Sequence, residues 1–195
     1  MGKSAFGRLK SKNNDKSLLL CLRLCLIFCV MLALGYYLAQ KGQAGVQDGF
    51  FEATSTTDGA VEFFVSVCKS SRLELILVFA IGLGALTFFC KLVACASLAV
   101  YGFACGAYAA ALLYDGKWYL LIAYLLTSVV IAYALLRFSL RMVTANHRFL
   151  SAEARKSSGF YFSPLLIKYA FVFLKAFLVV FAIRSVYGYL TLFLI

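Results

Sequence analysis

The sequence is poor in the residues that catalysis and metal binding need. It has one histidine, His147, and only eight acidic residues among 195. The seven cysteines form no C-x-x-C pair and no Cys/His ligand spacing, so we expect no metal and no cofactor. The sequence also lacks an H-E-x-x-H motif, a G-x-S-x-G motif and a phosphate-binding glycine loop. We therefore predict that the chain is not an enzyme.

Hydrophobic residues dominate what is present. They make up 64% of the sequence, and the mean hydropathy is +0.91, which is typical of an integral membrane protein. The net charge of +11 does not indicate nucleic-acid binding, because the lysines and arginines lie next to apolar segments on one side. The sequence predicts a single membrane domain over residues 1–195, with the lipid bilayer as its first partner.

The apolar segments predict an all-α integral membrane protein, a polytopic bundle of about five transmembrane helices. A basic tail (1–17) comes first, an acidic amphipathic loop (39–73) follows the first helix, and a basic loop (137–163) precedes the last. The basic loop has the length and composition of a projecting helix. Tight reversals are expected at Cys90-Lys91 and at Asp115-Gly116-Lys117. The predicted spans are 18–38, 75–90, 92–114, 118–136 and 164–186, the last followed by an apolar tail.

The distribution of charge predicts the orientation. Basic residues gather on the side of the amino terminus, whereas six of the eight acidic residues lie on the other side. Because positively charged loops stay in the cytoplasm, the amino terminus is expected there and the carboxyl terminus outside. The protein is then a multi-pass protein of the cell membrane.

Two interpretations remain open for Arg184 in the last span. In the favoured one, Lys168 and Lys175 extend toward the basic side and Arg184 extends toward the far side. In the other, the crossing starts near Lys175 and Arg184 is a buried charge, which usually marks a functional site. No acidic residue is predicted deep within a span, and this counts against ion-coupled transport.

Small residues recur at four-residue spacing in the middle spans. Such residues let helix backbones approach closely. Packing within the chain is the favoured interpretation, and self-association into a homo-oligomer through the same face is the alternative. The predicted helix-packing residues are Gly82, Gly84, Gly102, Gly106 and Ala110.

The outer loop combines acidic residues with aromatic ones. Its apolar positions from Asp58 to Cys68 suit a short amphipathic helix at the membrane surface. Packing on that surface is the favoured interpretation, and docking of an extracytoplasmic partner is the more specific alternative. The candidate docking residues are Phe50, Phe51, Phe63 and Phe64.

The order of these segments resembles the stage II sporulation protein M family across nearly the whole chain. The residues that carry the resemblance are the Gly102–Gly106 step, Phe138-Ser-Leu-Arg-Met142 and Lys168-Tyr-Ala-Phe171. The resemblance implies a non-catalytic membrane scaffold of the sporulation engulfment complex. Such a scaffold anchors peptidoglycan hydrolases, the D and P proteins of the same stage, at the septal membrane of the mother cell.

A second function class remains open. The chain could be the membrane subunit of a transporter, such as an ABC-type exporter whose cytosolic ATPase docks on the basic loop Arg137–Lys156. The basic loop also has a simpler explanation as an orientation signal. Partner identity separates the two classes, because a permease requires an ATPase and a scaffold of this kind requires cell-wall hydrolases.

Overall fold

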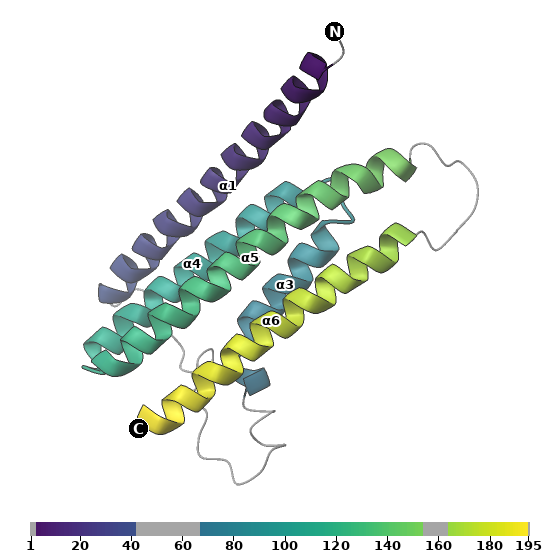
Figure 1. Cartoon of the computed structure of the whole chain (residues 1–195). Coiled ribbons are helices and arrows are strands. Elements are labelled where there is room, and N and C mark those ends of the chain that lie inside the picture. The colour runs from purple at the N-terminus through teal and green to yellow at the C-terminus, as the bar shows by residue number, and fades with distance from the viewer. Residues whose placement is uncertain (1–2, 42–66, 154–163, 195) are drawn as a thin grey trace.

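The computed structural model describes residues 3–41, 67–153 and 164–194, and all the regular elements in these ranges are helices (Figure 1). The prediction of an all-α fold is confirmed. Four of the helices contain segments long and apolar enough to cross a membrane: Leu18–Gln40, Cys90–Tyr114, Trp118–Asn146 and Tyr169–Leu190. The protein is therefore a helical membrane protein. The long helices and one short one are α1 (Lys3–Gln40), α3 (Arg72–Gly84), α4 (Cys90–Tyr114), α5 (Trp118–Glu153) and α6 (Pro164–Leu194).

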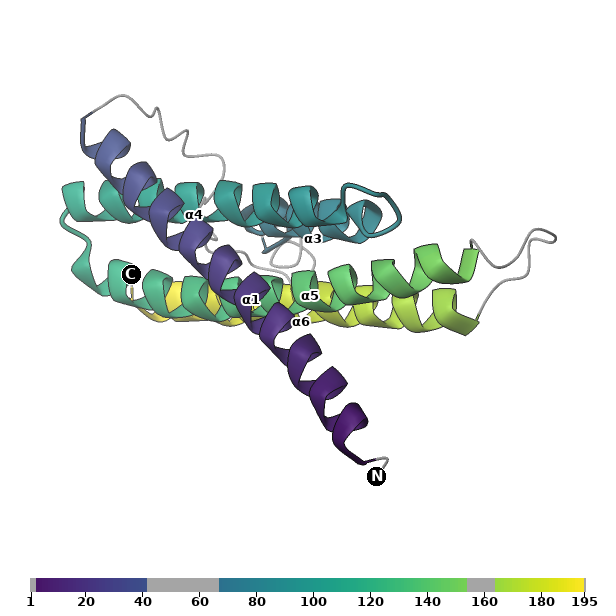
Figure 2. The ribbon, with the colours of Figure 1, turned by 90° about the horizontal axis from the view of Figure 1, so that it is seen from above.

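The helices alternate in direction through the bundle. In Figures 1 and 2, α1, α4 and α6 run one way and α3 and α5 run the other. The predicted reversal at Asp115-Gly116-Lys117 is confirmed, and Gly116 adopts a positive φ of 70° there. That backbone conformation is accessible to glycine at little cost. The reversal defines the α4–α5 end of the bundle, and the turn of residues 85–89 defines the opposite, α3–α4 end.

The second predicted span, 75–90, differs from the helix that the structure contains. Helix α3 has 13 residues and ends at Gly84, so the chain turns before Cys90-Lys91. Its length is about 20 Å, well below the roughly 30 Å of hydrocarbon that a crossing helix must span. The physical reason lies in α5. Asn146 Nδ2 donates hydrogen bonds to the carbonyls of Ala85 (2.6 Å) and Thr87 (2.8 Å), which stabilises the turn in place of further helix.

The other helices are longer than the predicted spans. Helix α5 continues from the predicted span 118–136 into the basic segment and ends at Glu153. It contains no glycine or proline, so nothing in its sequence interrupts it. Helix α6 likewise continues past residue 186 to Leu194, which makes the predicted apolar tail part of the helix.

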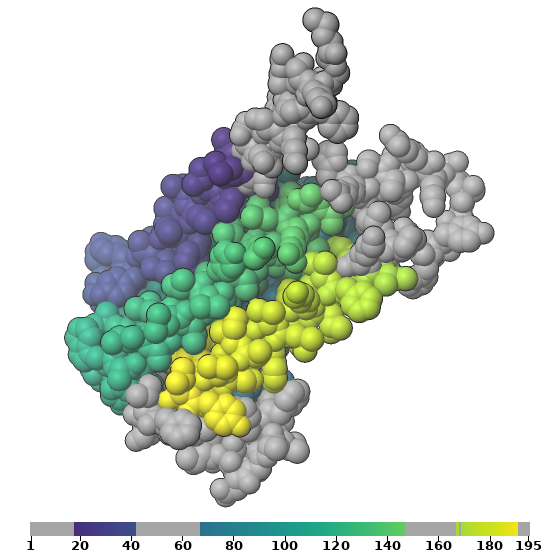
Figure 3. All heavy atoms as spheres, in the orientation of Figure 1, coloured from purple at the N-terminus to yellow at the C-terminus, as the bar shows by residue number. Residues whose placement is uncertain are grey.

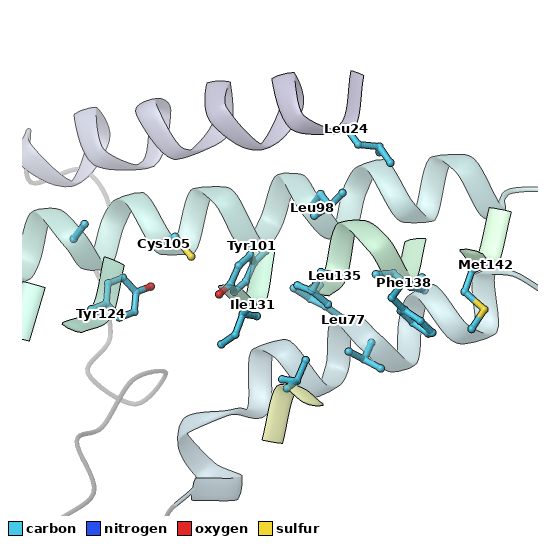
Figure 4. Close-up of a cluster of buried hydrophobic side chains, with 14 of the residues drawn as sticks. Leu24, Leu77, Leu98, Tyr101, Cys105, Tyr124, Ile131, Leu135, Phe138 and Met142 are labelled. Atoms are coloured by element: carbon cyan, nitrogen blue, oxygen red, sulfur yellow. The ribbon is translucent and has the colours of Figure 1, made fainter. Parts of the chain in front are cut away.

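The core lies among α3, α4, α5 and α6. Tyr101, Ile131 and Leu135 are fully buried where α4 and α5 meet (Figure 4). Helix α1 adds Leu24 to this cluster and crosses α4 obliquely on the outside (Figure 2). In the space-filling view, α5 and α6 lie side by side along one face (Figure 3). Most side chains on the outer faces are apolar, as lipid contact requires.

Candidate functional site: a buried ion pair between α3 and α6

Two charged side chains are buried inside the described part of the bundle. Glu74 lies in the first turn of α3, and Arg184 lies on α6; their side chains are 0% and 1% exposed. Arg184 Nη2 donates a hydrogen bond to Glu74 Oε1 across 110 residues of sequence. Because a buried charge without a partner is very costly, each of these residues makes the burial of the other feasible.

Tyrosine rings surround the guanidinium group. Its Cζ atom lies 5.9 Å from the centroid of the Tyr124 ring and 5.7 Å from that of Tyr187. The two rings meet edge to face at 6.2 Å, and Tyr108 meets Tyr124 in the same way at 4.7 Å. A cation is attracted to the face of an aromatic ring, and the attraction increases when water is absent. These rings therefore provide Arg184 with a second source of stabilisation.

The polar cluster extends from the ion pair into α4. Tyr101 and Tyr124 are fully buried, and Figure 4 shows their hydroxyl groups directed toward the same space beside Cys105. The Cys105 side chain is buried as well and lies beside these hydroxyl groups. The arrangement places one carboxylate, one guanidinium and several weak hydrogen-bonding groups in an enclosed region without exposure to solvent. Such a cluster is suited to holding helices together, or to changing its arrangement when another charged group approaches it.

The ion pair lies at a definite depth in the bundle. Arg184 lies against the Tyr124 ring, and Tyr124 follows Trp118, the first residue of α5, by six residues. Six residues of helix correspond to about 9 Å. The pair is therefore about a third of the way into the bundle from the α4–α5 end. Helix α3 starts at this depth rather than at the surface.

The structure corrects two sequence predictions here. Arg184 does not extend toward the far side, because it is buried and paired, as the alternative interpretation held. The other part of that alternative, a crossing that starts near Lys175, is not correct, since the apolar segment already includes Tyr169. The prediction that no acidic residue lies deep within a span did not anticipate Glu74, which is fully buried in the first turn of α3. In the sequence, Glu74 stands between the predicted outer loop (39–73) and the predicted span 75–90. The available signal was the opposite sign of the two charges in otherwise apolar segments.

The predicted packing glycines of α4 face α1. A Cβ atom on Gly102 would lie 2.6 Å from the Phe28 carbonyl oxygen, and one on Gly106 would meet the backbone of Leu32. From the α1 side, a Cβ atom on Gly35 would meet the Phe103 carbonyl. Only glycine permits this approach of two backbones. The face that could serve self-association is thus occupied by α1 of the same chain.

The remaining predicted packing residues lie at other contacts. A Cβ atom on Gly82 would lie 2.7 Å from the Phe173 ring of α6, and one on Gly84 would lie 2.8 Å from the Val93 side chain of α4. The Tyr169 hydroxyl also donates a hydrogen bond to the Gly82 carbonyl. Ala110 is buried in α4, with 6% exposure. The structure therefore distributes these residues over three helix contacts rather than one face.

Some sequence predictions fall outside the structure. Phe50, Phe51, Phe63 and Phe64 lie outside the described residues, as does most of the expected amphipathic helix. Within the ranges that are described, the seven cysteines are free thiols, and no three His, Cys, Asp or Glu side chains are grouped to hold a metal.

Comparisons with family models, with curated proteins and with solved structures find no match to this chain.

Proposed function

We propose that the chain is a non-catalytic membrane scaffold that presents its segment 42–66 to partner proteins. The observation that supports this proposal is that both ends of the segment are fixed to the bundle. Helix α1, which precedes it, contacts the α4 backbone at Gly102 and Gly106. Helix α3, which follows it, is held to α6 by the Glu74–Arg184 pair. A segment anchored at both ends is well suited to hold a partner at a fixed position.

In the proposed topology the amino terminus is cytoplasmic and the carboxyl terminus is outside. Helices α1 and α4 run in the same direction, so the chain between them has to return across the bundle, and α3 makes part of this return. The return gives five passes in total, one of them by a short helix. The segment 42–66 then lies outside, and the basic residues of α5 lie inside, which agrees with the positive-inside rule.

The resemblance to stage II sporulation protein M suggests the class of partner. In this proposal the scaffold localises peptidoglycan-degrading enzymes at the septal membrane during engulfment. The aromatic residues of an acidic outer segment, Phe50, Phe51, Phe63 and Phe64, form the contact. Aromatic side chains are frequent anchors of protein interfaces.

The test is crosslinking and affinity recovery of the full-length protein from sporulating cells, with partners identified by mass spectrometry. The test variant replaces Phe50, Phe51, Phe63 and Phe64 with alanine. Its matched control replaces Phe88 and Phe89, which are 86% and 68% exposed at the α3–α4 end. We expect the test variant to lose hydrolase recovery and the control to retain it. Equal recovery from both variants would remove the outer segment from the proposal.

Transport is a second candidate that one observation favours. Transporters often place ionisable residues inside the membrane and use helices that begin within it. The Glu74–Arg184 pair supplies the buried ionisable residues, and α3, which begins beside this pair, supplies the helix that starts inside the bundle. An exporter subunit would recover an ATPase in the same experiment, and this recovery would depend on the basic residues of α5. Recovery of an ATPase without any hydrolase would replace the scaffold proposal.

A further inference from the structure

One exposed face of α5 combines an apolar stripe with two arginines. Residues at three- and four-residue spacing lie on one side of a helix, so they form a continuous surface. The apolar members, between 49% and 66% exposed, are Ile122, Leu126, Val129, Val130 and Tyr133. The stripe continues into Arg137 and Arg141, which are also exposed. This surface is called the α5 stripe below.

The α5 stripe has the dimensions of a membrane. Trp118, at the start of α5, is 63% exposed and is a residue that favours the membrane interface. Arg137 follows it by nineteen residues, or about 28 Å of helix, close to the roughly 30 Å thickness of the hydrocarbon core. Arg141 lies one turn farther, about 6 Å beyond. When Trp118 sits at one interface, the two arginines reach the headgroups of the opposite leaflet.

Arg137 is held in place by its neighbour. Its Nη1 atom donates a hydrogen bond of 3.2 Å to the Tyr133 hydroxyl oxygen, and its Cζ atom lies 5.9 Å from the centroid of the Tyr133 ring. An arginine whose side chain is already oriented loses less entropy when it binds a ligand. The guanidinium fork also matches the geometry of phosphate oxygens. Because the Tyr133 hydroxyl accepts the hydrogen bond from Arg137, its own hydrogen atom is not used in that bond and can be donated to a phosphate.

Among residues with described side chains, the exposed charges at the level of the two arginines are positive. Helices α4 and α5 are antiparallel, and Tyr101 lies level with Ser128, which puts the exposed Lys91 near the level of the arginines. Among residues with described side chains, two are acidic. Glu74 is buried with Arg184, and Asp115 lies at the α4–α5 end. Neither can neutralise the two arginines.

We propose that Arg137, Arg141 and the Tyr133 hydroxyl form a headgroup site for an anionic phospholipid. The phosphate binds between the two guanidinium groups, and the acyl chains lie along the apolar part of the α5 stripe. A zwitterionic lipid would fit the same stripe, but its choline or ethanolamine group would meet the positive charge of the arginines. The site therefore selects lipids by headgroup charge.

The test measures lipid binding to the purified full-length protein in detergent, by native mass spectrometry. Phosphatidylglycerol and phosphatidylcholine with the same acyl chains are titrated separately. The double variant Arg137→Gln/Arg141→Gln is compared with Lys117→Gln, which removes one positive charge at the α4–α5 end. Since each basic residue near an anionic surface contributes roughly one kcal/mol, the affinity for phosphatidylglycerol should fall about fivefold per arginine and about 30-fold in the double variant. The control should bind like the unchanged protein.

Two further measurements separate the site from general effects. Arg137→Lys/Arg141→Lys keeps the charge and is expected to retain most of the preference for phosphatidylglycerol, while Tyr133→Phe is expected to weaken it. Raising the salt concentration should reduce the preference, because the charges are exposed. Equal affinity of the unchanged protein for both lipids would overturn the proposal. So would an equal loss in Lys117→Gln, or displacement of the lipid by an equal concentration of inorganic phosphate.

Discussion

The buried ion pair makes a quantitative prediction about stability. Replacing Glu74 with methionine leaves the Arg184 guanidinium buried without its partner, and arginine cannot lose its proton in a protein. Breaking a buried pair in this way costs about 3–5 kcal/mol. Replacing Arg184 with methionine leaves a carboxyl group, which can become neutral by taking up a proton. We therefore expect Arg184→Met to be less destabilising than Glu74→Met.

The double variant Glu74→Met/Arg184→Met completes the cycle. Replacing a whole buried pair with apolar residues of similar volume is often close to neutral. The double variant should consequently recover most of the stability that Glu74→Met loses. The free energy of unfolding can be measured by titrating sodium dodecyl sulfate into mixed micelles. The single tryptophan, Trp118, provides the fluorescence signal.

An exposed pair serves as the control. Lys117 and Asp115 are 3.7 Å apart and about half exposed, so breaking that pair should cost less than about 1 kcal/mol. The reasoning would be refuted if Glu74→Met cost no more than this control. It would also be refuted if the effects of the two single substitutions simply added in the double variant, because residues in direct contact should be coupled.

Three further predictions use the same unfolding assay. Gly106→Val should lower the free energy of unfolding by about 3 kcal/mol, the upper end of the overpacking range, because the obstructing atoms belong to the α1 backbone. The control Ala96→Val, on the exposed side of α4, should change stability little. Asn146→Ala should cost about 1–2 kcal/mol of stability, since two carbonyls of the turn lose their hydrogen-bond donor. An unchanged stability would show that the turn does not depend on Asn146. Tyr169→Phe should cost about 1 kcal/mol through loss of its hydrogen bond to Gly82; no change would count against that contact.

Much of the fold was predictable from the sequence because membrane helices have a simple signature. A long apolar run must become a helix, since lipid offers no hydrogen bonds to the backbone. The Asp115-Gly116-Lys117 reversal followed from polar residues and a glycine between two such runs. Polar side chains within a span bond to the helix itself: Thr127 Oγ1 donates to the Ala123 carbonyl at 3.0 Å.

The end of α3 and the ion pair were not predictable in the same way. Residues 85–89 are as apolar as the helix before them, and the turn there depends on Asn146, some sixty residues later. The pairing of Glu74 with Arg184 joins positions 110 residues apart. Hydropathy describes how a segment interacts with lipid, whereas these features depend on contacts between segments distant in the sequence.

The separation of Glu74 from Arg184 has a consequence for biogenesis. Glu74 leaves the ribosome long before Arg184 has been synthesised, because the chain is made from its amino terminus. Until α6 arrives, α3 carries the chain back between α1 and α4 while Glu74 still lacks its partner, so α3 should be held only weakly. The short helix that stands second among the described helices would therefore be the last to gain its final packing. Completion of α6 is then the event that closes the bundle.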